Sequence, residues 1–151
     1  MEKEVGDNFL RSKIYTTTSG NHLLFIKLLT AATITLNINA SFIDWGDGTQ
    51  STNTFSHTYS TAGTYTIKCD GTTLKANFIS PNSILYEAHF AKNLTTIQQN
   101  AFSNQTYLQI LTLPSSCTNI AAENVFDGCV SLNALVFPTN CSITKLNAVK
   151  V

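Results

Sequence analysis

The sequence predicts a mainly β protein with two parts, an all-β first half and a short solenoid of repeats in the second half. Two stretches, 33–38 and 64–69, alternate polar and apolar residues with a period of two, as half-buried strands do. After about residue 72 the sequence repeats every 23 to 24 positions. About one residue in seven is Thr and only 12% are charged, against a usual charged fraction of about 25%. This composition favours exposed β-structure, because β-branched side chains fit a pleated surface.

The repeat is read most clearly in two segments. Residues 108–114 read Leu-x-x-Leu-x-Leu-Pro, and residues 132–138, 24 positions later, read Leu-x-x-Leu-x-Phe-Pro. Phe102 and Phe126 are 24 positions apart as well, and residues 85–90 form a degenerate copy 23 positions before the first. One coil cannot cover its own apolar face, whereas stacked coils form a continuous core. We therefore expect two clear coils and one degenerate coil, each with a short strand.

These motifs resemble BspA-type leucine-rich repeats. The segment Phe-Asp-Gly-Cys-Val-Ser-Leu at 126–132 carries the resemblance most closely, together with residues 97–114. The earlier copy departs from the family pattern, since Asn104-Gln105 replaces Gly-Cys. The resemblance covers residues 72–151 and implies a solenoid that presents or binds rather than catalyses.

The first half contains the expected strands 33–38 and 64–69, and we expect residues 23–29 to form an early edge strand. Between them, residues 43–49 predict a strand that ends in a tight turn, where Gly-Asp-Gly supplies positive φ angles. The Asp-Trp-Gly-Asp-Gly-Thr motif, followed by His-Thr-Tyr-x-x-x-Gly-Thr-Tyr at 57–65, resembles a PKD domain. That resemblance implies a small immunoglobulin-like β-sandwich over residues 12–71, preceded by an N-terminal arm at 1–11.

Several polar and aromatic residues of this motif have two interpretations. Asp44 and Asp47 have the chemistry of Ca²⁺ ligands, but an Asp in such a turn more often binds its own backbone. His57 has no nucleophile and orienting acid that can be identified around it, so we interpret it as a structural turn residue. Trp45 and Tyr59 would suit a sugar-stacking platform, but core packing and a tyrosine corner are favoured. We predict no catalytic residue, no metal site and no cofactor.

The four cysteines are Cys69, Cys117, Cys129 and Cys141, and they lack the paired spacing of a zinc site. Cys117 and Cys141 fall one repeat apart, so they would lie on neighbouring coils. We expect buried thiols that act as small hydrophobic residues, with a Cys117–Cys141 disulfide as the alternative.

Charge and hydropathy exclude several classes of function. Lys and Arg number nine, as do Asp and Glu, so binding through neutralised phosphates is not expected. No apolar run approaches the roughly 20 residues that a membrane-spanning helix needs. Residues 1–8 lack the features of a secretory signal. We expect either export by another route, such as inside a virion, or a processed segment with a new Met1.

A partner-binding surface is predicted on the coil strands. Their outward residues form two columns, which begin polar at Glu87 and His89 and become apolar toward the C-terminus. The chain also stops at Val151, partway into a further coil, and an open solenoid end exposes core residues and strand edges. We therefore hypothesise docking of a protein partner or a second copy. The residues predicted at this contact are Ile110, Thr112, Ala134, Val136, Ile143 and Val151.

The leading functional hypothesis is a non-catalytic surface-display, binding or structural protein outside the cytoplasm. A phage tail or capsid-surface component comes first, and a fragment of a bacterial surface adhesin follows. A carbohydrate-binding module is the second class of function, for which Tyr86 and Tyr107 are the only exposed aromatic candidates in the repeats. An enzyme is third, because no nucleophile motif or phosphate-binding glycine loop is found.

Overall fold

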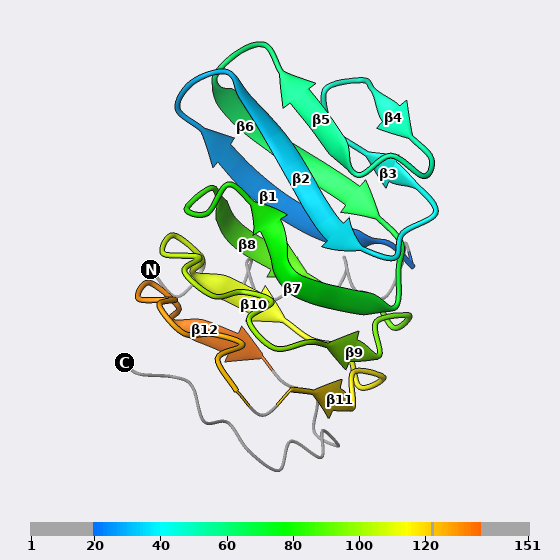
Figure 1. Ribbon diagram of the computed structural model, residues 1–151, viewed down its shortest axis with the longest axis vertical. Coiled ribbons are helices and arrows are strands. Elements are labelled where there is room, and N and C mark those ends of the chain that lie inside the picture. Colours follow the sequence, from blue (N-terminus) through cyan, green and yellow to red (C-terminus); the bar gives the residue numbers. More distant parts are fainter. Residues whose placement is uncertain (1–19, 122, 137–151) are drawn as a thin grey trace, which may run out of the picture.

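The computed structural model describes residues 20–121 and 123–136, which form strands and contain no helix (Figure 1). The twelve strands are β1 (His22–Leu28), β2 (Ala32–Ile38), β3 (Ile43–Asp44), β4 (Gln50–Ser51), β5 (Ser56–Tyr59), β6 (Gly63–Cys69), β7 (Thr73–Ser80), β8 (Leu85–His89), β9 (Thr96–Ile97), β10 (Ile110–Thr112), β11 (Asn119–Ile120) and β12 (Ala134–Val136). The predicted arm at 1–11 lies outside the described residues. The mainly β fold is confirmed.

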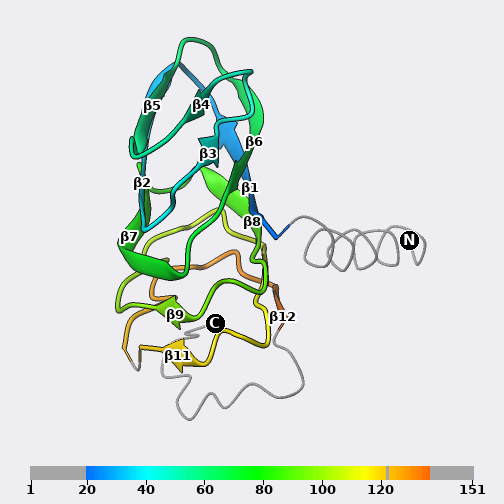
Figure 2. The ribbon, with the colours of Figure 1, turned by 90° about the vertical axis from the view of Figure 1, so that its right-hand side faces the viewer.

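The strands form two sheets that face each other, as Figure 2 shows from the side. The seven-stranded sheet has the order β12-β10-β8-β1-β6-β3-β4, and the five-stranded sheet has the order β11-β9-β7-β2-β5. A single cluster of buried apolar side chains fills the space between them from one end of the molecule to the other. The core therefore does not stop where the repeats begin.

Alternation along the strands decides which side chains enter this core. In β2, Ile34, Leu36 and Ile38 are buried while the intervening residues are exposed, which is the period-two pattern of a half-solvated strand. The prediction that residues 23–29 form an edge strand is wrong. β1 pairs with β6 on one side and with β8 on the other, so it lies inside the sheet, where the second half of the chain supplies the neighbour.

Both sheets contain strands from before and after residue 71, where the sequence suggested a boundary. β7 and β8 pair antiparallel with β2 and β1. From there on the pairing is parallel, through β8, β10 and β12 in one sheet and β7, β9 and β11 in the other. Each coil contributes one strand to each sheet, so the β1 and β2 strands cover the first coil as a cap would.

A ladder of phenylalanines runs through the stacked coils. The ring centroids of Phe78 and Phe102 are 5.7 Å apart, and those of Phe102 and Phe126 are 5.6 Å apart. All three side chains are buried. Asn77, inside β7, and Asn100 and Asn124 have left-handed backbone conformations near this ladder, with φ of 51°, 59° and 53°, and asparagine tolerates that conformation better than most residues. The first coil therefore begins within β7, earlier than the Leu-x-x-Ala-x-Phe copy indicated.

His22 joins the first strand to the first coil. Its side chain is fully buried, with Nε2 2.9 Å from the Gly71 carbonyl oxygen and Nδ1 3.0 Å from the Ala91 amide nitrogen. The Ala91 amide can only donate, so Nδ1 accepts and Nε2 carries the proton of a neutral ring. Burial lowers the pKa of His22, and the hydrogen bond to Gly71 and the charge of Asp70 only partly oppose this effect.

Candidate functional site

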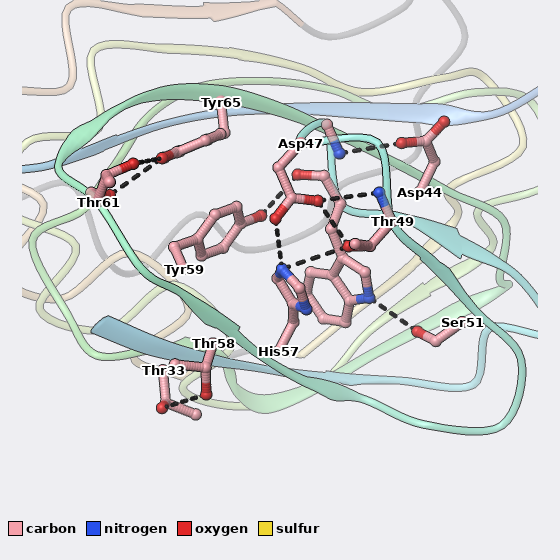
Figure 3. A network of polar contacts seen from close by, with 12 residues as sticks. Thr33, Asp44, Asp47, Thr49, Ser51, His57, Thr58, Tyr59, Thr61 and Tyr65 are labelled. Atoms are coloured by element: carbon pink, nitrogen blue, oxygen red, sulfur yellow. Dashed lines mark hydrogen bonds and ion pairs between the residues drawn. The ribbon is translucent and has the colours of Figure 1, made fainter. Parts of the chain in front are cut away.

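Trp45 and Tyr59 lie in the core at the end of the molecule that carries β3 to β5. Each side chain is 1% exposed, and the Tyr59 hydroxyl donates to the Trp45 carbonyl oxygen at 2.6 Å (Figure 3). Burial, with smaller contributions from nearby Asp and Tyr charges, raises the pKa of Tyr59. The core-packing interpretation is confirmed, because neither ring is open to a ligand. The tyrosine-corner interpretation of Tyr59 is not, because its hydroxyl bonds a carbonyl 14 residues upstream and not one a few residues away.

His57 stabilises the turn after β3 through a cluster with Asp47 and Thr49, which Figure 3 shows pointing toward one another. His57 Nε2 lies 2.7 Å from Asp47 Oδ2 and 3.3 Å from the Thr49 hydroxyl. Both neighbours therefore meet the same ring nitrogen. A catalytic triad needs its acid and its nucleophile on opposite nitrogens, so this cluster has the geometry of a structural bond.

The carboxylates of this turn are occupied by the chain itself. Asp44 accepts the Gly46 amide at 2.9 Å, and Asp47 accepts the Thr49 amide at 3.0 Å. Burial works to raise the pKa of Asp47, but hydrogen bonds from Thr49 and His57 outweigh it and hold the pKa below its ordinary value. Among the described residues, no group of three or more His, Cys, Asp or Glu could hold a metal ion. The turn interpretation of both carboxylates is confirmed.

The described cysteines are core residues. Cys69 and Cys117 are fully buried, and Cys129 is 8% exposed. Burial is the main cause that raises the pKa of Cys69 to about 12 and that of Cys129 to about 11, so both thiols stay protonated and unreactive near neutral pH. Cys141 lies outside the described residues, so a Cys117–Cys141 disulfide stays a prediction.

The predicted columns of outward residues are confirmed as neighbours in the seven-stranded sheet. One column joins Glu87, Ile110 and Ala134, and the other joins His89, Thr112 and Val136. Leu111, between them, is fully buried, as alternation requires. Ile143 and Val151 lie outside the described residues, and the partner-binding role of the whole set stays a prediction.

Antiparallel pairing extends both columns onto the first half of the chain, which sequence reasoning missed. Leu23 pairs with His89 and with Lys68, and Phe25 pairs with Glu87 and with Thr66. The two resulting rows cross β6, β1, β8, β10 and β12, and we call this surface the outer face. Its residues are Lys68, Leu23, His89, Thr112 and Val136 in one row, and Thr66, Phe25, Glu87, Ile110 and Ala134 in the other.

His89 is more buried on this surface than we expected. We expected an exposed polar residue, but its side chain is only 1% exposed. Its Nε2 lies 2.6 Å from Glu87 Oε1, its Nδ1 lies 3.0 Å from the Thr112 hydroxyl, and the Phe25 ring packs edge-on against it. Neighbours on two other strands therefore cover a side chain that points away from the core. Val136, at the far end of the row, is 39% exposed.

A groove of about 560 Å³ opens beside the outer face, where the β1–β2 turn meets the β7–β8 turn. Tyr86 and Tyr107, the two aromatic candidates of the repeats, both line it, although Tyr86 is half-buried and not exposed as expected. Tyr107 is 55% exposed. The structure thus brings together two residues that lie 21 positions apart in the sequence. The remaining lining residues are Lys27, Leu28, Leu29, Thr30, Ala32, Thr64, Pro81, Ser83, Ile84 and Gln109.

Comparison with known proteins identifies the second half of the chain. Residues 72–150 match the family profile described as a BspA type leucine-rich repeat region with six copies. This match covers 79 of the 151 residues, and it does not extend to the PKD-like motif of the first half. No curated protein and no solved structure matches the chain. The matched residues are those whose strands pair in parallel from coil to coil. The chain belongs to the BspA-type leucine-rich repeat family.

Proposed function

We propose that this protein is a non-catalytic binding protein that docks a protein partner through the outer face. Family membership indicates a surface or protein-binding repeat protein. The observation that carries the finer proposal is the pair of rows that crosses five strands. The half-buried Phe25, Ile110 and Ala134 and the exposed Val136 lie there among a few polar groups, and such a mixture is typical of a binding surface.

Among the described residues, no group of three or more His, Cys, Asp or Glu that could hold a metal ion competes with this proposal. Glu87, His89 and Thr112 have the order of an acid, a base and a hydroxyl, but His89 is only 1% exposed, so these residues offer no open site for a substrate.

The setting we propose is extracytoplasmic, with the surface of a phage virion first and a bacterial cell surface second. The PKD-like motif at 44–65 and the repeats both resemble modules of display and adhesion proteins. Within the described residues, no helix is long and apolar enough to cross a membrane. Mass spectrometry of purified virions tests the first setting. Detection in the particle supports it, and recovery only from the cell envelope favours the adhesin.

Self-association is the most direct test of the outer face, because a second copy is the first partner to examine. Ile110→Lys adds a charge within the face, on β10, and places it beside Glu87, which limits the cost to folding. Asn119→Lys adds the same charge to an exposed position of the other sheet. Sedimentation equilibrium should show association of the wild type and of Asn119→Lys, and at least tenfold weaker association of Ile110→Lys.

A wild type that stays monomeric at about 1 mM, where a binding free energy of about −4 kcal/mol gives half-saturation, would contradict the self-association version. Equal association of the two lysine variants would contradict the outer face as the contact.

A further inference from the structure

We propose that the groove at Tyr86 and Tyr107 binds a saccharide that carries a carboxylate group. This site is separate from the centre of the outer face, and the proposal does not depend on the docking of a protein partner. The groove volume, about 560 Å³, falls in the range of about 300–1,000 Å³ that small-ligand pockets occupy.

A bulge in β8 turns Tyr86 toward this groove. In the pairing of β1 with β8, Phe25 faces Glu87 but the next residue, Ile26, faces Leu85, so Tyr86 is the extra residue. Bulges re-aim side chains in this way. The Tyr86 ring lies 6.2 Å from that of Phe25, on the outward side of the sheet. Regular alternation would have placed the Tyr86 side chain on the same side of the sheet as the buried Ala88. The repeat strand β10 contains no such bulge in its pairing with β8.

Tyr107 reaches the same groove from the next coil. It stands immediately before the first leucine of its coil, where the neighbouring coils have Ile84 and Ser131. The aromatic residue contributes little to the core here, because 55% of it is exposed. Two aromatic side chains from successive coils thus line one groove.

The polar residues that line the groove indicate which class of ligand it binds. Thr64 and Gln109 are exposed and offer a hydroxyl and an amide, and Lys27 is the one charged residue among the residues that line the groove. In the described part of the chain, the ion pairs join other residues, namely His57 with Asp47 and His89 with Glu87. A pyranose ring has an apolar face of C–H groups for a tyrosine and hydroxyls for such neighbours. Lys27 adds a preference for a carboxylate.

Other ligand classes fit less well. A peptide that adds a strand needs a free sheet edge, but β1 and β8, which contribute residues to the groove, each have paired neighbours on both sides. An acyl chain would leave Thr64, Gln109 and Lys27 without partners. A nucleic acid would need more than one cation along its backbone. A charged saccharide satisfies the aromatic, hydroxyl and cationic parts together.

Calorimetric titration with tetragalacturonate and with its neutral methyl ester tests the proposal. The wild type should bind the acid at least about threefold more tightly than the ester, as one exposed ion pair allows, and 0.5 M NaCl should reduce that preference. Tyr107→Ala should weaken binding of both probes about tenfold, while Tyr107→Phe retains the ring and should stay near the wild type.

Two lysine variants isolate the charge. Lys27→Gln should remove the preference for the acid and leave the ester unaffected. Lys68→Gln, which removes an exposed lysine from β6 of the same sheet, should behave as the wild type. No binding of either probe at millimolar concentration, equal binding of acid and ester by the wild type, or unchanged binding by Tyr107→Ala would each overturn the proposal. Ile110→Lys should retain saccharide binding, so failure of the protein-docking proposal is seen separately.

Discussion

The two halves of this molecule build the same two sheets, but they specify their strand neighbours differently. In the repeats, strands pair in parallel at a fixed spacing, and Phe78, Phe102 and Phe126 stack because each coil copies the last. In the first half, strands pair antiparallel, and unique contacts such as the Tyr59–Trp45 hydrogen bond fix the turns. Periodicity therefore specifies one half, and individual side chains specify the other.

The largest effect should come from breaking the phenylalanine ladder. Phe102→Ala removes a fully buried ring that packs on Phe78, Phe90 and Phe126. Loss of such a ring costs about 3–5 kcal/mol of unfolding free energy. Urea unfolding followed by circular dichroism should show this loss. Val130→Ala, at a position 76% exposed in the next coil, should change the free energy by less than about 0.5 kcal/mol, and an equal loss in both variants would contradict the ladder.

The second-largest loss of stability is expected at His22, which joins the first strand to the first coil. His22→Ala leaves the Gly71 carbonyl and the Ala91 amide buried without their partner, which we expect to cost about 3 kcal/mol. Because the folded pKa of His22 is lowered by burial, the unfolded chain takes up the proton first. Stability should therefore fall as the pH drops below about 6.5, the ordinary histidine pKa.

Thermal unfolding of the wild type and of His22→Gln between about pH 7 and pH 5 checks this dependence. The slope with pH should be smaller in the variant. Parallel pH profiles for the two proteins would show that His22 does not titrate in this way.

A smaller effect is expected in the first half. Tyr59→Phe keeps the ring but removes the hydroxyl that donates to the buried Trp45 carbonyl, at a cost of about 1–2 kcal/mol. Tyr65→Phe is the matched control, since its hydroxyl bonds the exposed Thr61 carbonyl. The denaturant midpoint should fall more for Tyr59→Phe than for Tyr65→Phe, and a larger fall for Tyr65→Phe would contradict the importance of the Tyr59–Trp45 hydrogen bond.

The smallest effect should be electrostatic. The pKa of Asp47 lies below its ordinary value in the fold because Thr49 and His57 bind its carboxylate. Its contribution to stability is therefore present above the unfolded pKa of about 3.9 and is lost as the pH falls through the lower folded pKa. Asp47→Asn should lower the unfolding midpoint slightly at pH 7 and have less effect near pH 2. A constant difference across that range would contradict the linkage.

Sequence reasoning succeeded where a period fixed the answer. The spacing of Leu108 and Leu132 placed Ile110 beside Ala134, and the alternation of β2 identified Ile34 and Leu36 as core residues. Local motifs succeeded too, because the Asx turn at Asp47 depends on residues two positions apart.

Non-local pairing explains the failures. Nothing in residues 23–29 shows that β8 will become their neighbour, so the edge-strand prediction was wrong. The burial of His89 under Phe25 follows from the same unforeseen pairing. The groove depends on a bulge at Tyr86 that only the register of β1 against β8 creates. Phe78 carried a signal, since it lies 24 positions before Phe102, but the degenerate first coil obscured it.

Trp45 provides the most direct test of the central claim, that the two halves form one cooperative unit through shared sheets. It is the only tryptophan in the chain and lies in the core of the first half, whereas Phe102 lies in the repeats. We predict that Phe102→Ala shifts the urea midpoint seen by Trp45 fluorescence as much as the midpoint seen by circular dichroism. A Trp45 transition that stays at the wild-type midpoint while the circular dichroism transition moves would show that the halves unfold separately, and would contradict the account.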